Sequence, residues 1–233
     1  MSPPAPGAAA AARKDTRGLA RATPPVDEAW LVRARLPPSF YARPVLAVAR
    51  ACIGKVLVHR DPAGLLAGRI VETEAYRGPR DLAAHSAGGR RTRRTEAMFG
   101  PPGRAYMYFL YGMHWAFNVV TGAEGYPHAV LIRAVEPLLG EPLMARRRGQ
   151  VPGSVGLGNG PGKLCQAFGL DGGHYGLDLC GDRLWLAEPP PGAPRWAVGT
   201  SPRINVAYAG EWADRPWRFY ARGQRTVSVA PRD

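Results

Sequence analysis

Residues 105–120 read AYMYFLYGMHWAFNVV, two aromatic-rich runs that meet at Tyr111-Gly112. Because both runs are rich in aromatic and β-branched residues and a turn residue separates them, this stretch predicts a β-hairpin. Alternate residues of a strand share a face, so Tyr108 in the first run and Asn118 in the second can both face a cavity. The plain alternative is that these side chains pack in the core.

The chain beyond residue 38 mixes strands and helices without a regular βαβ alternation or an internal repeat. Helices are predicted from residue 44 to about 55, over 141–148 and from 161 onward. Strands are predicted over 55–60, 68–76, 129–135, 183–186, 202–206, 217–220 and 226–229. This mixture favours an α+β fold: a single compact domain whose curved, mostly antiparallel sheet carries surrounding helices and a protruding β-hairpin.

The sequence divides into an arm, residues 1–38, and a domain, residues 39–233. The arm consists mainly of Ala, Pro and Arg without sustained periodicity, so it is expected to be disordered. It does not resemble a secretory signal, because basic residues follow its short alanine run. The 233 residues are 45% hydrophobic, which is enough for one substantial domain, and 29 Gly with 24 Pro favour a loop-rich or β-containing fold.

The chain is strongly basic, with 31 Lys+Arg against 18 Asp+Glu and a formal charge of +13. Removing the arm leaves +10, so the basicity belongs to the folded part. A charge of this size predicts a nucleic-acid partner; a solubility feature or contact with an anionic membrane is the alternative. No apolar run is long enough to cross a membrane. Three scattered cysteines without a zinc ligand pattern predict no metal, and a reducing, cytoplasmic setting.

Residues 77–104 lack hydrophobic periodicity and are expected to form a long basic loop with room for a turn of helix. Their cationic side chains are candidates for binding phosphate, although a solvated loop is the plain reading. These side chains are Arg90, Arg91, Arg93 and Arg94. His85 precedes them and by itself indicates little. Lys163 follows Gly160-Pro161-Gly162 at a predicted helix start, which is a weak signal for an anion site.

The segment GRIVETEAY, residues 68–76, carries two carboxylates in one strand. Alternation predicts that Ile70, Glu72, Glu74 and Tyr76 share a face. That pattern fits a general base with a stacking partner, or an exposed strand face. Arg133 lies within AVLIRAV, where an unpaired guanidinium is costly to bury, so it is expected to pair with Glu74 or Glu72 unless it faces water from an edge strand.

Six blocks in order resemble the alkyladenine (3-methyladenine) DNA glycosylase family, over roughly residues 39–229. They read IVETEAY, DLAAHS, MFGPPGRAYMYFLYGMHWAFNVV, LIRAVEP, NGPGKLCQA and AGEWADRPWRFY. The resemblance implies an α+β domain that acts without metal or cofactor. It implies a monofunctional, monomeric enzyme that hydrolyses the N-glycosidic bond of alkylated purines such as 3-methyladenine in double-stranded DNA, with hypoxanthine and ethenoadenine as further substrates. A cytoplasmic location, on the nucleoid in a bacterium, is expected.

The resemblance also implies roles for individual residues. Glu74 resembles the family's general base for water, Arg133 its partner in holding that water, and the carbonyl of Val206 a third contact. Tyr76, His85 and Tyr108 resemble the walls that stack on the flipped base, and Asn118 the residue that disfavours guanine. Tyr111 resembles the side chain that fills the space vacated in the duplex. The segments 149–159 and 186–200 and the arm depart from the family's better-known members.

A base inside a duplex is inaccessible, so excision requires eversion of the nucleotide, and a carboxylate can then stabilise the oxocarbenium-like sugar and activate water. Tyr111 at a hairpin tip suits the wedge that such eversion needs, whereas core packing is its plain alternative. A non-catalytic nucleic-acid-binding module on the same fold is the alternative function. The presence of Glu74, Arg133 and Tyr111 together favours the enzyme, because a binding module does not need a carboxylate beside an apolar strand.

Overall fold

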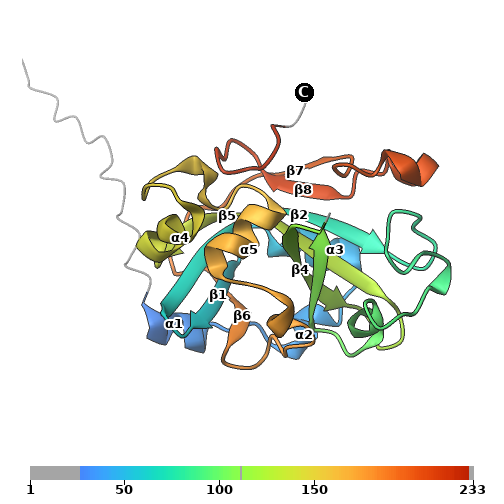
Figure 1. Cartoon of the computed structure of the whole chain (residues 1–233), viewed down its shortest axis with the longest axis horizontal. Helices are drawn as coiled ribbons and strands as arrows, with labels where there is room; N and C mark the ends of the chain where they lie inside the picture. Colours follow the sequence, from blue (N-terminus) through green and yellow to red (C-terminus); the bar gives the residue numbers. More distant parts are fainter. Residues whose placement is uncertain (1–26, 111, 231–233) are drawn as a thin grey trace, which may run out of the picture.

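The computed structural model describes residues 27–110 and 112–230, and the strands of this part form one curled, half-barrel-like antiparallel sheet (Figure 1). The strand order is β3-β4-β5-β2-β1-β6, with β8 paired to both β2 and β7. The strands are β1 Val56–Asp61, β2 Gly64–Arg77, β3 Ala105–Leu110, β4 His114–Thr121, β5 His128–Leu139, β6 Leu184–Ala187, β7 Val198–Ser201 and β8 Arg218–Ala221. The predicted fold class and hairpin-forming strands are confirmed.

The 14-residue strand β2 organises the sheet, because it pairs with β1, β5 and β8. Its register with β5 shifts around Glu72, which interrupts simple alternation. Ile70 consequently lies in the same core cluster as Ala75, five residues away, and not with the glutamates. The prediction that Ile70 shares a face with Glu72 and Glu74 is therefore wrong.

Helices cover the sheet and supply much of the core. The α-helices are α1 Glu28–Arg33, α2 Pro38–Tyr41, α3 Val45–Cys52, α4 Glu141–Arg148 and α5 Pro161–Phe168. Helix α3 packs on β2 and β5, and α5 packs on β4 and β5. Both α4 and α5 end at glycines with positive φ, Gly149 at 61° and Gly169 at 67°, as left-handed C-caps require. The helices predicted from residue 44, over 141–148 and from 161 are confirmed.

The loop between β2 and β3 has only short 3-10 turns, η1 Ala87–Gly89 and η2 Glu96–Phe99, as its missing periodicity predicted. Three other turns are η3 Val155–Leu157, η4 Gly172–His174 and η5 Ala207–Trp212. Within residues 27–110 and 112–230, no helix has the length and apolar character needed to cross a membrane.

The folded part begins before residue 39, which corrects the predicted boundary of the arm. Helix α1 is capped by Asp27, and its Leu31 is fully buried against the core cluster that contains Trp185. The sequence did not indicate this helix, because a short helix without strong periodicity is stabilised by packing against the core and not by a local pattern. The rest of the arm, residues 1–26, lies outside the described residues.

Two predicted strands near the C-terminus are wrong. Residues 202–206 form a turn, because Pro202 lacks a backbone donor and Asn205 has a left-handed φ of 58°. The strand in this region is β7, a few residues earlier. Residues 226–229 also form no ladder; Ser228 instead donates to a buried side chain, Glu72.

Candidate active site

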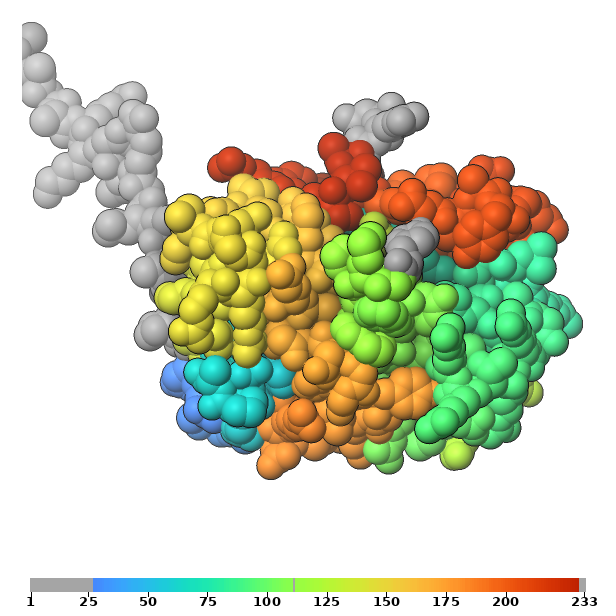
Figure 2. Space-filling view, viewed as in Figure 1, coloured from blue at the N-terminus to red at the C-terminus, as the bar shows by residue number. Residues whose placement is uncertain are grey.

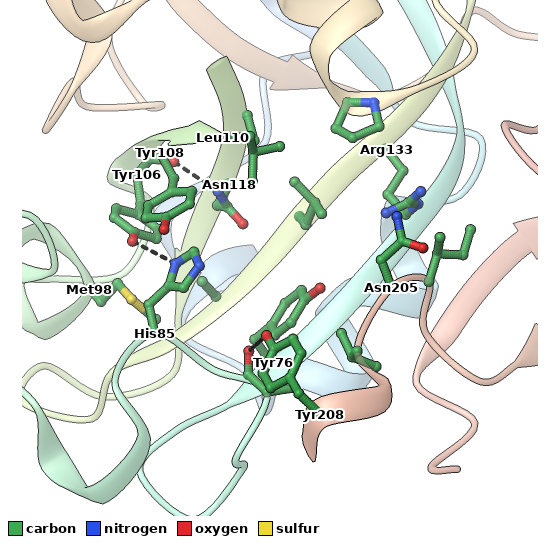
Figure 3. Close-up of a pocket in the computed structure, with 17 residues that line it drawn as sticks. Tyr76, His85, Met98, Tyr106, Tyr108, Leu110, Asn118, Arg133, Asn205 and Tyr208 are labelled. Atoms are coloured by element: carbon green, nitrogen blue, oxygen red, sulfur yellow. Dashed lines mark hydrogen bonds between the residues drawn. The ribbon is translucent and has the colours of Figure 1, made fainter. Parts of the chain in front are cut away.

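A cavity of about 450 Å³ opens between the hairpin, the loop after β2 and the turn at 204–208. Six of the residues singled out in the sequence line it: Tyr76, His85, Tyr108, Asn118, Arg133 and Val206. Figure 3 shows His85 and Tyr108 on one side of the cavity and Arg133 and Asn205 on the other, with Tyr76 and Tyr208 between them. Residues from distant parts of the chain therefore converge on one cavity.

Glu74 is fully buried beside this cavity, and three donors hold its carboxylate. Oε2 accepts from the Tyr76 hydroxyl at 2.8 Å and from Arg133 Nη1 at 3.2 Å, and Oε1 accepts from the backbone N–H of Ile204 at 2.7 Å. Burial and the neighbouring Glu74 carboxylate raise the pKa of Tyr76 well above its usual value, so the phenol remains a donor.

Arg133 bridges Glu74 and a second buried carboxylate, Glu72, to which its Nε donates at 2.9 Å. The prediction that Arg133 finds a carboxylate is confirmed, and both candidates are engaged. Burial opposes the charge of Arg133, but the pull of Glu74 and Glu72 is stronger and raises its pKa. Glu72 also accepts from Arg218 Nε at 2.7 Å. Two carboxylates and two guanidiniums thus balance inside the protein, as buried charges require.

An aromatic pair forms one wall of the cavity. The rings of His85 and Tyr108 stack at a centroid distance of 3.7 Å and an angle of 28°. His85 Nδ1 also hydrogen-bonds the Tyr106 hydroxyl at 2.9 Å. Although part of the His85 residue is exposed, desolvation of its ring lowers its pKa to about 4. The imidazole is therefore uncharged at neutral pH and does not repel a cation in the cavity.

Asn118 lies deeper, on β4, and is 6% exposed. Its Nδ2 donates to the backbone carbonyl of Tyr106 at 3.1 Å, which leaves Oδ1 directed toward the cavity (Figure 3). Since that bond joins neighbouring strands of the hairpin, the amide cannot reorient without breaking it. A carbonyl oxygen fixed at this place accepts hydrogen bonds and offers none.

The turn at 203–206 contributes Arg203 and Asn205, which the sequence did not single out, as well as Val206. Asn205 lines the cavity in the left-handed conformation, and the following carbonyl, that of Val206, accepts from Ala209 N–H at 2.9 Å. The buried pair Arg203 and Asp81 anchors this turn, with Nη1 to Oδ2 at 2.6 Å. No periodic pattern in the sequence indicates Arg203 or Asn205. Asp81 was marked only by its position at the start of the block DLAAHS.

Arg203 also supports the cavity from behind. Its guanidinium lies 4.8 Å from the centre of the Tyr76 ring, on which it packs as a cation–π partner. Tyr208 lines the cavity as well and is 72% exposed, at the rim. The buried Arg203–Asp81 pair thus supports the Tyr76 wall of the cavity, and the exposed ring of Tyr208 lies at the cavity rim.

The hairpin that flanks the cavity is visible on the face shown in Figure 2. Phe109 and Met113, on either side of its tip, are 45% and 70% exposed. Tyr111, the predicted wedge, lies outside the described residues, so its role stays a prediction.

The predicted phosphate-binding side chains are all exposed: Arg90, Arg91, Arg93, Arg94 and Lys163. Two of these side chains already have protein partners. Arg91 pairs with Glu96 at 2.5 Å, and Lys163 Nζ donates to Asn159 at 3.0 Å. Arg93 and Arg94 line a second cavity beside the hairpin. Their position near the tip is compatible with the phosphate contacts predicted for them.

The part of the chain that the structure describes contains no group of three or more His, Cys, Asp or Glu side chains arranged to hold a metal ion. The chemistry that these residues can perform is that of a carboxylate acting on water, beside a fixed guanidinium and next to a cavity with aromatic walls.

A family model for methylpurine-DNA glycosylase matches residues 39–225. Three relatives bear the name "Putative 3-methyladenine DNA glycosylase". The protein of Anaeromyxobacter dehalogenans (strain 2CP-C) is 51% identical over 195 residues, 83% of this chain and 86% of the relative. That of Desulfitobacterium hafniense (strain Y51) is 50% identical over 202 residues, 84% and 98% of the two chains. That of Bacillus cytotoxicus is 44% identical over 202 residues, 83% and 99%. The aromatic cavity and its buried carboxylate thus occur in a chain that belongs to the methylpurine-DNA glycosylase family.

Proposed function

We propose that this enzyme, a DNA-3-methyladenine glycosylase of base excision repair, everts the damaged nucleotide into the aromatic cavity and hydrolyses its N-glycosidic bond with Glu74 as general base. The observation that carries the proposal is the buried Glu74–Arg133 pair at the edge of a 450 Å³ cavity. A carboxylate kept out of bulk water and oriented by three donors is suited to activate one bound water molecule.

Glu74 has two tasks in this mechanism. Its carboxylate takes a proton from water as the oxygen attacks C1′ of the deoxyribose, and its charge stabilises the oxocarbenium-like sugar of the transition state. Arg133 and the carbonyl of Val206 hold the water on either side. Because 3-methyladenine is already cationic, it leaves without a proton donor. Hypoxanthine and ethenoadenine, proposed as further substrates, are neutral and need a proton from another group.

The walls of the cavity select the base. Tyr76 on one side and the stacked His85–Tyr108 pair on the other sandwich a purine; such stacking contributes roughly 1–3 kcal/mol per base. An uncharged His85 admits a cationic base without repulsion. Asn118 is proposed to disfavour guanine by its bulk: the amide is fixed by its bond to the Tyr106 carbonyl, so it does not move away to make room for the exocyclic amino group. Selection thus depends on shape and charge together.

The duplex is proposed to lie across the hairpin. Tyr111 fills the space left by the everted nucleotide, and the exposed arginines of the loop at 90–94, with Lys163, contact phosphates. We propose that one chain suffices as a monomer, because every group assigned above to chemistry or base binding comes from a single copy. The cost of unstacking, a few kcal/mol, is offset by stacking in the cavity and by the wedge.

Replacing Glu74 by Gln tests the proposal. Glu74→Gln keeps the size of the side chain but removes the base, so release of 3-methyladenine from alkylated duplex DNA should be abolished. Affinity for the same DNA should stay within about tenfold, or 1.4 kcal/mol. Glu124→Gln, in an exposed loop, is the matched control and should retain the wild-type rate. Wild-type release by Glu74→Gln contradicts the assignment of the base.

A further inference from the structure

Glu72 lies two residues before the proposed base, and neither carboxylate is among the residues that line the cavity. Glu74 contacts three lining residues, Tyr76, Arg133 and Ile204, whereas Glu72 contacts one, Arg133. Glu72 is fully buried, and its two oxygens accept from four donors. Oε1 accepts from Arg133 Nε at 2.9 Å, Arg218 Nε at 2.7 Å and Ser228 Oγ at 2.9 Å, and Oε2 accepts from Ser228 N–H at 2.6 Å. A carboxylate with this many donors has little remaining capacity to bind water or substrate, so its effect is exerted through the groups that it holds.

Arg133 is the group through which Glu72 reaches the cavity. The guanidinium is planar, so the bond from Nε to Glu72 sets the direction in which Nη1 points, and Nη1 meets Glu74 at 3.2 Å. Nη2 lies 3.4 Å from Ser228 Oγ. Two residues that do not line the cavity, Glu72 and Ser228, therefore determine how Arg133 is oriented toward Glu74.

Ser228 belongs to a segment beyond residue 225, where the match to the family ends. The segment is seated on the protein by further contacts: Val227 packs against a cluster that contains Val71 and Ala134, and the Val229 carbonyl accepts from Arg218 Nη2. Residues 226–229 are hereafter called the C-terminal latch. The latch closes the charged cluster on the side away from the cavity.

On the basis of the proposed function, we infer that Glu72 and Ser228 of the C-terminal latch are positioning residues for the reaction. They hold Arg133 so that it orients Glu74 and its water. Neither side chain touches the base or the sugar. The balance of charge makes the arrangement specific, since Glu72 and Glu74 together neutralise Arg133 and Arg218. Loss of the Glu72 carboxylate leaves one uncompensated positive charge and an Arg133 drawn wholly toward Glu74.

The first test is single-turnover release of 3-methyladenine by Glu72→Gln, with affinity for the same DNA measured in parallel. The rate should fall between about 10- and 100-fold, as displacement of an orienting group costs. The affinity should stay within about tenfold, because Glu72 does not line the cavity. A folded variant with the wild-type rate, or one whose loss lies wholly in DNA affinity, overturns the inference.

The second test uses Ser228, which is only partly buried, so its variants are expected to fold even if Glu72→Gln does not. Ser228→Ala should lower the single-turnover rate about tenfold with unchanged DNA affinity, and Ser228→Thr, which keeps the hydroxyl, should restore it. Ser154→Ala, the same change in another loop, should have no effect. Equal rates for Ser228→Ala, Ser228→Thr and wild type overturn the role of the latch.

Measuring Glu74→Gln in parallel separates the two proposals. If Glu74→Gln is inactive while the Glu72 and Ser228 variants match the wild type, the proposed function stands and the positioning role fails. If Glu74→Gln remains active, the assignment of the base fails first, whatever the other variants do.

Discussion

The hydroxyl of Tyr76 has a different task from its ring. The ring forms a wall of the cavity, whereas the hydroxyl donates to Glu74 Oε2 at 2.8 Å. Hydrogen bonds to a charged group are worth roughly 1.5–3 kcal/mol. The same side chain therefore lines the cavity proposed for the base and helps to fix the orientation of the Glu74 carboxylate.

Tyr76→Phe separates these tasks. The variant should bind lesion DNA as the wild type does, because the ring remains. Its single-turnover release of 3-methyladenine should be about tenfold slower, because Glu74 loses one of the three donors that orient its carboxylate. Tyr126→Phe, at an exposed tyrosine, is the control. An unchanged rate would show that the hydroxyl does not act on Glu74.

At the scale of elements, a histidine pair ties β1 to α5 and η4. His59 Nδ1 bonds the Phe168 carbonyl at 2.8 Å, and its Nε2 meets His174 Nε2 at 3.1 Å. The contact to the carbonyl requires the proton on Nδ1, so His174 donates to the other nitrogen. Burial lowers the pKa of His59 to about 4, which means that the folded protein holds this ring uncharged.

This histidine makes stability depend on pH. In the unfolded chain His59 titrates near 6.5, so its neutral form contributes fully to stability above that pH. As the pH falls from 6.5 toward 4, the unfolded state binds the proton first and stability is lost, on the order of 3 kcal/mol at most. Denaturant unfolding between pH 4 and 7 should show a shallower dependence in His59→Asn, whereas the exposed His114→Asn should match the wild type. Equal slopes for all three would exclude His59 as the source.

Helix α1 should behave as part of the domain. Leu31 is fully buried in the cluster with Trp185, and Leu→Ala at such sites costs about 2–5 kcal/mol. Leu31→Ala should lower the free energy of unfolding by that amount, while Val32→Ala, an exposed neighbour, should change it by less than about 0.5 kcal/mol. Chemical denaturation measures both. If Leu31→Ala leaves the free energy of unfolding unchanged, α1 does not belong to the folded domain.

For the whole molecule, the sheet order places the hairpin side of the cavity and the basic loop at one end and α1 at the other, because β3 and β6 are the two ends of the strand order, Arg93 and Arg94 lie beside β3, and α1 packs against β6. The hairpin and the turn at 203–206 face each other across this cavity (Figure 3). DNA binding is thus expected to involve one end of the molecule while the other contributes to its net charge of +13 only at long range.

The salt dependence of DNA binding tests whether DNA binds at the end of the molecule that carries the basic loop. Each phosphate contact adds about 0.9 to the slope of log affinity against log salt concentration. Arg93→Gln combined with Arg94→Gln should therefore reduce the slope for duplex DNA by up to about 2. Arg33→Gln, on α1, removes a charge from the other end and should leave the slope unchanged. Fluorescence anisotropy between 50 and 200 mM salt, about the range in which such contacts are lost, measures all three. An equal slope in every variant would move the phosphate contacts elsewhere.

Local patterns were enough for elements whose ends and faces are set by neighbours in the chain. The helix at 141–148 could be predicted because glycine closes it, and the pairing of Arg133 followed from the cost of an isolated buried charge. Local patterns failed at residues 202–206, where β propensity was outweighed by the buried Arg203–Asp81 pair and the left-handed Asn205. They also failed at Ile70, because a register shift depends on the partner strand.

The residues themselves indicated a pair of carboxylates and a guanidinium that needs a partner, and the resemblance of six ordered blocks to a known family implied the roles of Glu74 and of the aromatic walls. The task of Glu72 could not be predicted in this way, because its donors Arg218 and Ser228 lie 146 and 156 residues away along the chain. Only folding brings them to the same oxygens. A buried ion must find all its partners at once, and those partners are set by three-dimensional packing, not by spacing along the chain.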